Sequence, residues 1–176
     1  MMKFSKQKGF TIVELLIVVV VIAILAAITI VSYNGIQSKA QLSKVDSDIA
    51  TLNKAILIAR NSKSEVALRY VTNNTATGGN CWSKPDGTNL AALLQSDACW
   101  TAYALALDKI STASSINVRN LVDPWGRPYY IDENEGEGAI PATACSPDQI
   151  GYYSRPFTTG QTMIKLKSIA LIQPAC

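Results

Sequence analysis

The stretch Lys8-Gly9-Phe10-Thr11-Ile12-Val13-Glu14-Leu15-Leu16-Ile17 begins an apolar run that decides the fold of this 176-residue chain. No charged residue occurs from Leu15 to Ile28, and Glu14 is the one carboxylate at the start of the run. As a helix with a rise of about 1.5 Å per residue, residues 10–31 would span roughly 33 Å, which is enough to cross a bilayer core of about 30 Å. A carboxylate in hydrocarbon is costly unless it has a partner, so Glu14 is a candidate functional residue.

The residues before this run indicate how it would be oriented in a membrane. They include three lysines and no acid, namely Lys3, Lys6 and Lys8. We therefore expect a single-pass protein of the plasma (inner) membrane, with a cytoplasmic N-terminus and an exported C-terminal domain. A secretory signal peptide is a competing interpretation, but its apolar core is shorter, about 7–15 residues. A plain signal anchor accommodates the length but gives Glu14 no role.

A third interpretation comes from the motif itself. Gly9-Phe10-Thr11-Ile12-Val13-Glu14, followed by a long Leu/Ile/Val/Ala run, resembles the N-terminus of the type IV pilin and pseudopilin family, over residues 3–31. The resemblance implies that a prepilin peptidase cuts between Gly9 and Phe10 and that Phe10 is then N-methylated. It implies that Phe10 and Glu14 serve assembly, because the family's glutamate pairs with the N-terminal amine of a neighbouring subunit. Opposite charges about 4 Å apart attract by ~4 kcal/mol at an intermediate effective dielectric, so this pairing would set the axial register of a filament.

The same resemblance implies the partners. We expect a homo-oligomeric filament that includes other pilins, an assembly platform with its ATPase, and membrane lipid around the subunit before assembly. The filament could be a type IV pilus or a pseudopilus, with motility and adhesion, protein secretion or DNA uptake as its use. The alternative is a monomeric, membrane-anchored exported binding domain that does not polymerise; it would keep its leader and be indifferent to Glu14.

The hydrophobic pattern divides the chain into a basic leader (1–9), an apolar transmembrane helix (10–31), an amphipathic continuation (32–62) and an exported globular domain (63–176); the resemblance implies that the leader is cleaved and that the apolar helix serves assembly. We expect one helix from about residue 11 to about 62, weakened near Gly35, since glycine in a helix interior costs about 1 kcal/mol. Apolar residues of the continuation recur at spacings of three and four, and this stripe should pack on the chain's own domain. The stripe consists of Leu42, Val45, Ile49, Leu52, Ile56 and Ala59.

A long helix followed by short β-prone runs predicts an α+β fold, in which the helix packs on a small antiparallel sheet, and the resemblance implies that this fold is pilin-like. Residues 73–80 are polar and rich in turn formers, which predicts a loop. Residues 89–107 favour one or two short helices around Cys99-Trp100. Short β-prone runs separated by turns follow at residues 129–131, 150–154 and 163–171.

Four cysteines, Cys81, Cys99, Cys145 and Cys176, would lie in an oxidising compartment after export, which favours two disulfides. Three connectivities exist; we favour Cys81–Cys99 with Cys145–Cys176, because each closes one local region. A zinc site is the rival, but the chain has no C-x-x-C pair and no histidine. The absence of histidine also removes His-dependent triads, so we expect no enzyme.

The second informative motif is Asp123-Pro124-Trp125-Gly126, which predicts a turn in which the aspartate accepts backbone N–H bonds. It resembles a segment that precedes the sheet in major pseudopilins of type II secretion systems. Those proteins often bind calcium in a later acidic loop, but the corresponding stretch here, 154–160, has no acidic residue. A different run could hold a hard cation or could be a solvated loop, and the expectation is no cofactor, with calcium as the weak candidate. Its acidic residues are Asp132, Glu133, Glu135 and Glu137.

The charge balance argues against a strongly electrostatic partner. The whole chain carries 16 basic and 13 acidic residues, and the leader accounts for three of the basic ones. The processed subunit would be formally neutral, which suits dense packing in a polymer. Nucleic-acid binding is therefore not indicated by net charge.

Overall fold

The computed structural model describes residues 9–64, 67–73, 77–85, 87–135, 146–153 and 163–171. The chain forms two compact units, Met1–Leu42 and Ser43–Cys176; we call the second the head unit. The leader before Gly9 lies outside the described residues.

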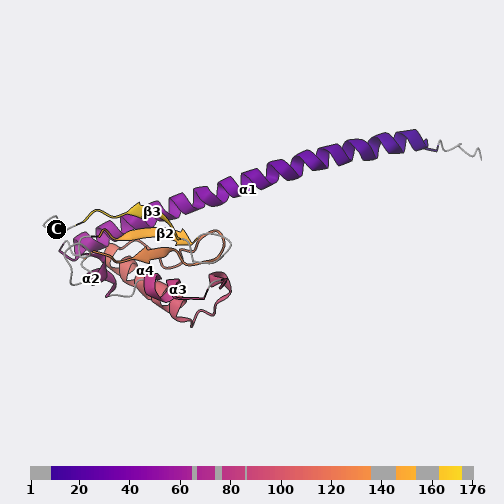
Figure 1. Cartoon of the computed structure of the whole chain (residues 1–176). Coiled ribbons are helices and arrows are strands. Elements are labelled where there is room, and N and C mark those ends of the chain that lie inside the picture. Colours follow the sequence, from indigo (N-terminus) through magenta and orange to yellow (C-terminus); the bar gives the residue numbers. More distant parts are fainter. Residues whose placement is uncertain are drawn as a thin grey trace, which may run out of the picture. The chain divides into compact units, whose positions relative to one another are not determined.

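Helix α1 (Ile12–Ser62) is continuous over 51 residues, as its ribbon in Figure 1 shows. Its bounds agree with the predicted 11–62. The window Ile12–Thr29 has a mean hydropathy of 3.1 and is not buried within the protein, so by length and composition it could cross a membrane. The helix passes through Gly35 without a break, and a Cβ added there would meet no atom within 4 Å.

In its described residues the head unit adds four helical elements and a sheet to the end of α1. The helical elements are α2 (Leu68–Thr72), α3 (Thr77–Trp82), the 3₁₀ turn η1 (Leu90–Ala92) and α4 (Ala98–Ser114). The strands are β1 (Tyr130–Asp132), β2 (Gln149–Tyr153) and β3 (Met163–Ser168). They form an antiparallel sheet in the order β1-β2-β3, which confirms the α+β prediction.

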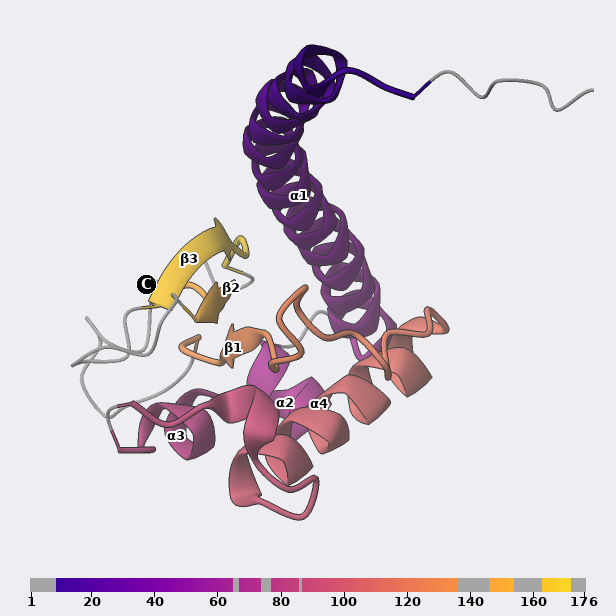
Figure 2. The same cartoon turned by 90° about the vertical axis from the view of Figure 1, so that its right-hand side faces the viewer.

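Three helices differ from the sequence-based expectation: α2 was not predicted, α4 extends beyond the predicted 107 to Ser114, and α3 begins within a predicted loop. The predicted loop 73–80 is wrong at its end, because α3 begins at Thr77 and includes two glycines that disfavour helix. Tertiary contacts explain the helix: α3 contacts α4 and β1, and Cys81 within it is bonded to Cys99 of α4. In both overall views α3 and α4 lie next to each other on the β1 side of the sheet (Figures 1 and 2).

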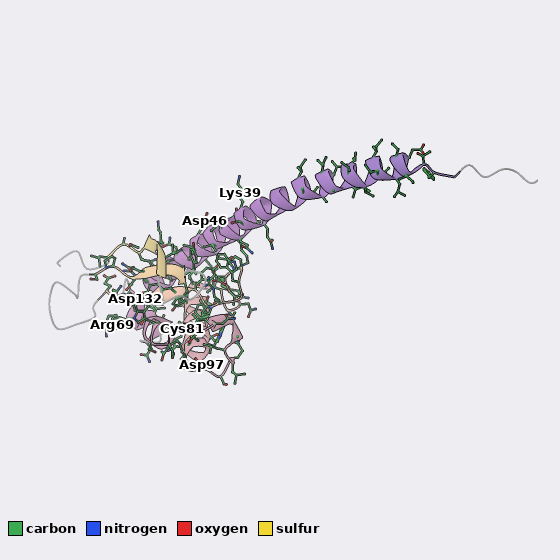
Figure 3. All side chains as sticks on the ribbon, turned by 45° about the vertical axis from the view of Figure 1, so that its right-hand side comes forward. Lys39, Asp46, Arg69, Cys81, Asp97 and Asp132 are labelled. Carbon is green, nitrogen blue, oxygen red and sulfur yellow. A yellow bond between two sulfur atoms is a disulfide. The ribbon has the colours of Figure 1, made fainter. Side chains whose placement is uncertain are left out.

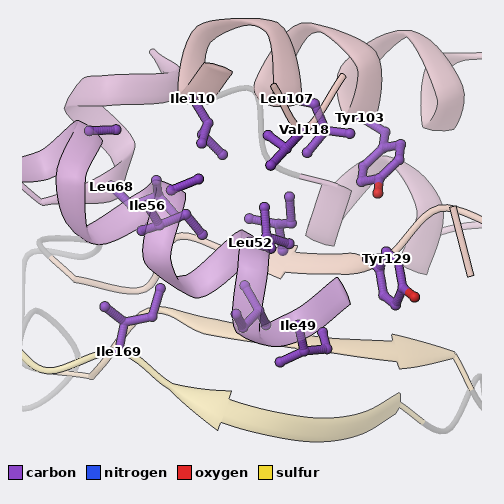
Figure 4. Packing of buried hydrophobic residues seen from close by; sticks show 14 of the residues in the cluster. Ile49, Leu52, Ile56, Leu68, Tyr103, Leu107, Ile110, Val118, Tyr129 and Ile169 are labelled. Atoms are coloured by element: carbon purple, nitrogen blue, oxygen red, sulfur yellow. The ribbon is translucent and has the colours of Figure 1, made fainter. Parts of the chain in front are cut away.

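The core of the head unit forms around the predicted stripe of α1. Val45, Ile49, Leu52, Ile56 and Ala59 are all buried, and they join one cluster with residues of α4 and of the sheet. Figure 4 shows this packing at close range. The cluster includes Tyr103, Leu107, Ile110, Val118, Tyr129, Ile131, Ile150 and Ile169.

The stripe prediction is wrong at Leu42, which is 48% exposed. Leu42 is the last residue of the N-terminal unit, so the buried part of the stripe begins at Val45. The charged residues Lys39 and Asp46 of α1 are exposed and extend from the helix (Figure 3).

Candidate functional site

The first turn of α1 forms a reciprocal hydrogen-bonded cap. The backbone N–H of Glu14 donates to Thr11 Oγ1 at 3.2 Å, and the Glu14 carboxylate accepts the backbone N–H of Thr11 at 2.8 Å. The Thr11 hydroxyl also donates to this carboxylate, at 2.7 Å. This is a capping box, in which a threonine before the helix and a glutamate three residues later satisfy each other's N–H groups. The pattern Thr-x-x-Glu at residues 11–14 is the sequence signal of this cap, although the sequence-based prediction did not include it.

The cap determines where helix geometry begins. Gly9 and Phe10 precede α1 and are non-helical, and Phe10 is 89% exposed. The Gly9–Phe10 peptide bond is therefore in a non-helical, exposed segment directly before a capped helix. Among the described residues, the Glu14 carboxylate bonds only to Thr11. The pairing of this carboxylate with another subunit's amine stays a prediction.

The Asp123 turn has the geometry that the motif predicts. Asp123 Oδ1 accepts the backbone N–H groups of Trp125 at 2.9 Å and Arg127 at 2.8 Å, and Gly126 adopts a positive φ of 77°. The buried Arg127 guanidinium donates back to Asp123 Oδ2 at 2.7 Å and lies 4.9 Å from the centre of the Trp125 ring. Trp125 also contacts Tyr152 of β2, with ring centres 5.8 Å apart. The turn thus attaches the chain before β1 to the sheet.

The acidic run after β1 is not the solvated loop that the sequence suggested. Glu133 and Glu135 are both 2% exposed. Glu135 pairs with Arg60 near the end of α1, with an N–O distance of 2.6 Å, and Glu133 accepts a hydrogen bond from Thr72. That part of the expectation is therefore wrong, because both carboxylates bind other parts of the head unit.

The described residues of the acidic run do not form a metal-binding cluster. Asp132 accepts bonds from the Tyr130 hydroxyl and from Asn134 Nδ2, the latter at 2.8 Å. Glu137 lies outside the described residues. Within the described ranges, no group of three or more His, Cys, Asp or Glu side chains could hold a metal ion.

Asp148 completes the buried charged cluster around Arg60. It is fully buried, lies 3.8 Å from the Arg60 guanidinium, and accepts the backbone N–H groups of Glu135 and Leu68. Burial raises the pKa of Asp148 above its ordinary value, with the charge of Glu135 adding to the effect and its hydrogen bonds and Arg60 opposing it. Arg60 also donates to the Ala170 carbonyl at 2.9 Å, so the cluster joins α1, the chain after β1 and the chain after β3.

The Cys81–Cys99 disulfide is present, as predicted. It lies in a second small core with Leu90, Tyr130 and Tyr153. Asp97 caps α4 by accepting the backbone N–H of Cys99 at 2.8 Å. Figure 3 labels Asp97 and Cys81. The predicted Cys145–Cys176 pair lies outside the described residues.

Comparison with known proteins identifies the motif in the N-terminal segment. Residues 4–30 match the family model of the prokaryotic N-terminal methylation motif. The chain is 39% identical over 80 residues to the type IV major fimbrial protein FimA of Dichelobacter nodosus, which covers 43% of this chain and 51% of that protein. It is 37% identical over 78 residues to the type IV major pilin protein PilE1 of Neisseria gonorrhoeae, which covers 41% of each.

A third relative matches over more of the chain. The type II secretion system core protein G of Klebsiella pneumoniae is 22% identical over 151 residues, which covers 83% of this chain and 89% of that protein. The chain spans about half or less of the length of the two pilins above. No solved structure matches it. The chain thus carries the prepilin-type N-terminal methylation motif, and its relatives are type IV pilins and a type II secretion pseudopilin.

Proposed function

We propose that this chain is a structural subunit of a type IV pilus or pseudopilus filament, with no catalytic activity of its own. The observation that carries the proposal is the N-terminal methylation motif on an apolar helix whose first turn contains Glu14. In the proposed pathway a prepilin peptidase cuts between Gly9 and Phe10, and Phe10 is N-methylated. The subunit lies in the inner membrane with its N-terminus cytoplasmic until a platform protein and an ATPase assemble it with other pilins.

The capping box supports a specific role for Glu14 before assembly. Its carboxylate has local donors in Thr11, so the charge is not left unpaired while the subunit is a monomer. In a filament, the new amine of Phe10 on a neighbouring subunit would offer a full positive charge. An ion pair in a low-dielectric surrounding is stronger than a hydrogen bond from a neutral donor to the same carboxylate, so the pair would favour the assembled state and one axial register.

A pseudopilus is favoured within this proposal. The relative that matches most of the chain is a type II secretion core protein, whereas the two pilins match only parts of it. The Asp123 turn, which forms as the motif predicts, resembles a segment of major pseudopilins and adds to this preference. Transport of exported proteins is therefore the use that we infer first, and retraction-driven adhesion is the alternative.

The first test is chemical. The intact mass of membrane-extracted protein should show the loss of nine residues and the gain of one methyl group. Glu14→Gln should keep membrane insertion and processing but reduce filament yield at least tenfold, since loss of one charge partner costs more than about 1.4 kcal/mol. Thr29→Val is the matched control, because Thr29 is a polar residue of the same apolar segment that donates only to its own helix, at Ala26.

Other outcomes would support the competing function. A chain that keeps its leader, and whose behaviour Glu14→Gln leaves unchanged, would be a membrane-anchored binding domain that does not polymerise. We also propose that the subunit needs no calcium at the acidic run, since Glu133 and Glu135 already bind Thr72 and Arg60. A chelator should leave the melting temperature unchanged, and a fall of several degrees would contradict this.

A further inference from the structure

The side chains of α1 become buried in the head unit within one helical turn of the start of that unit. Ser43 is the first residue of the unit, and Val45, 1% exposed, is the first fully buried side chain of α1. The apolar stripe that follows, beginning with Ile49 and Leu52, buries surface without fixing direction, because the hydrophobic effect is non-directional. A helix held by such a stripe alone could slide or roll slightly. Directional hydrogen bonds at this end would prevent that.

Such bonds are present beside Val45. Lys44 Nζ donates to the Val122 carbonyl at 2.9 Å and forms an ion pair with Asp48, one turn further along α1. Asp48 in turn accepts the hydroxyl of Tyr129 at 2.6 Å. Two side chains from one face of α1 thus reach both ends of the segment 122–129, which is about 80 residues away in sequence.

The surroundings make the Tyr129–Asp48 bond stronger than a surface pair. The Asp48 side chain is 14% exposed and Tyr129 is fully buried, whereas the Lys44 side chain is 49% exposed. Burial, with the neighbouring Asp48 charge, raises the pKa of Tyr129, so its hydroxyl stays protonated and donates over the whole physiological range. Hydrogen bonds to a charged acceptor that is largely shielded from water exceed ordinary neutral ones in strength.

We propose that Lys44, Asp48 and Tyr129 form a clamp that fixes the rotation and register of the first buried turn of α1 and holds it against segment 122–129. The helix is the covalent connection between the apolar segment and the head unit, so a pull on the apolar segment enters the unit at Ser43, next to the clamp. In a filament under tension the clamp would therefore oppose the separation of α1 from its own domain. That consequence rests on the proposed function, whereas the clamp itself does not.

Hydrogen exchange of the full-length chain in detergent tests the clamp without any filament. Lys44→Met and Tyr129→Phe each remove donors while keeping similar volume. Tyr129→Phe should raise amide exchange at residues 44–52 about tenfold or more, because a shielded bond to a charged group is lost, and Lys44→Met, which removes bonds of a half-exposed side chain, about two- to threefold. Exchange in α4 around Leu107 and Ile110 should change less than twofold.

The controls repeat the same substitutions at exposed positions. Lys54→Met on α1 and Tyr70→Phe on α2 should leave exchange at 44–52 unchanged. In the double variant the two effects should be less than multiplicative, because both act through Asp48. Unchanged exchange at 44–52 in both single variants, equal acceleration in α4, or fully multiplicative effects would each overturn the proposal.

Discussion

Removal of Arg60 should be strongly destabilising because its guanidinium is the cation of a buried acidic cluster. Arg60 is 2% exposed, lies 2.6 Å from Glu135 and 3.8 Å from Asp148, and donates to Ala170. Arg60→Met keeps most of the side-chain length but removes the guanidinium that lies beside the buried Glu135 and Asp148 carboxylates. Breaking a buried ion pair from one side costs about 3–5 kcal/mol.

This cost translates into a large shift in melting temperature. At ~2.1 cal/mol/K of unfolding entropy per residue, a unit of about 130 residues loses roughly 3.5 °C for each kcal/mol. Arg60→Met should therefore melt about 10–18 °C below the parent chain, as followed by near-ultraviolet circular dichroism of the full chain in detergent. Arg119→Met is the matched control, since its ion pair with Asp108 is exposed and should contribute about 0–1 kcal/mol.

A second variant separates charge from packing. In Arg60→Met/Glu135→Met the buried Glu135 charge, which has lost its ion pair with Arg60, is replaced by an apolar group, so the double variant should be more stable than Arg60→Met alone. A double variant as unstable as, or less stable than, the single one would refute the reasoning. It would mean that the lost bonds and contacts of Arg60, and not an uncompensated carboxylate, caused the destabilisation.

Two further predictions concern the disulfide and the buried acid. Replacing both Cys81 and Cys99 by alanine should cost about 3 kcal/mol, as expected for opening a loop with a sequence separation of 18, and limited proteolysis should then cut first around α3. Unchanged melting and unchanged proteolysis would contradict this. Because the pKa of Asp148 is raised on folding, its contribution to stability is greatest below its unfolded pKa and is lost as pH rises through the folded pKa. The melting temperature of Asp148→Asn, compared with the parent chain, should therefore improve from pH 4 to pH 7. A difference that is constant across this range would show that no proton is taken up there on folding.

Local pattern predicted the elements that local chemistry controls. The apolar run and the stripe of α1 gave a helix within one residue of the observed Ile12–Ser62, because 3.6-residue periodicity is a property of the sequence alone. The three strands and the Asp123 turn were predicted for the same reason, since alternation, proline and glycine act over a few residues. The motif around Glu14 was also readable, because its glycine, phenylalanine and glutamate lie within six positions.

Contacts between distant residues decided the rest. The sequence could not show that Glu135 is buried, because its partner Arg60 lies 75 residues earlier. From local sequence alone, a carboxylate next to a glycine is expected in a solvated loop. Helix α3 forms despite its glycines because the disulfide and the contacts with α4 and β1 outweigh a weak local preference. The sequence by itself thus determined the anchor motif, the long helix and the strand positions, through short-range periodicity. Only the tertiary structure decided which charges are buried and where α1 first meets the head unit, because burial depends on neighbours that the linear order does not reveal.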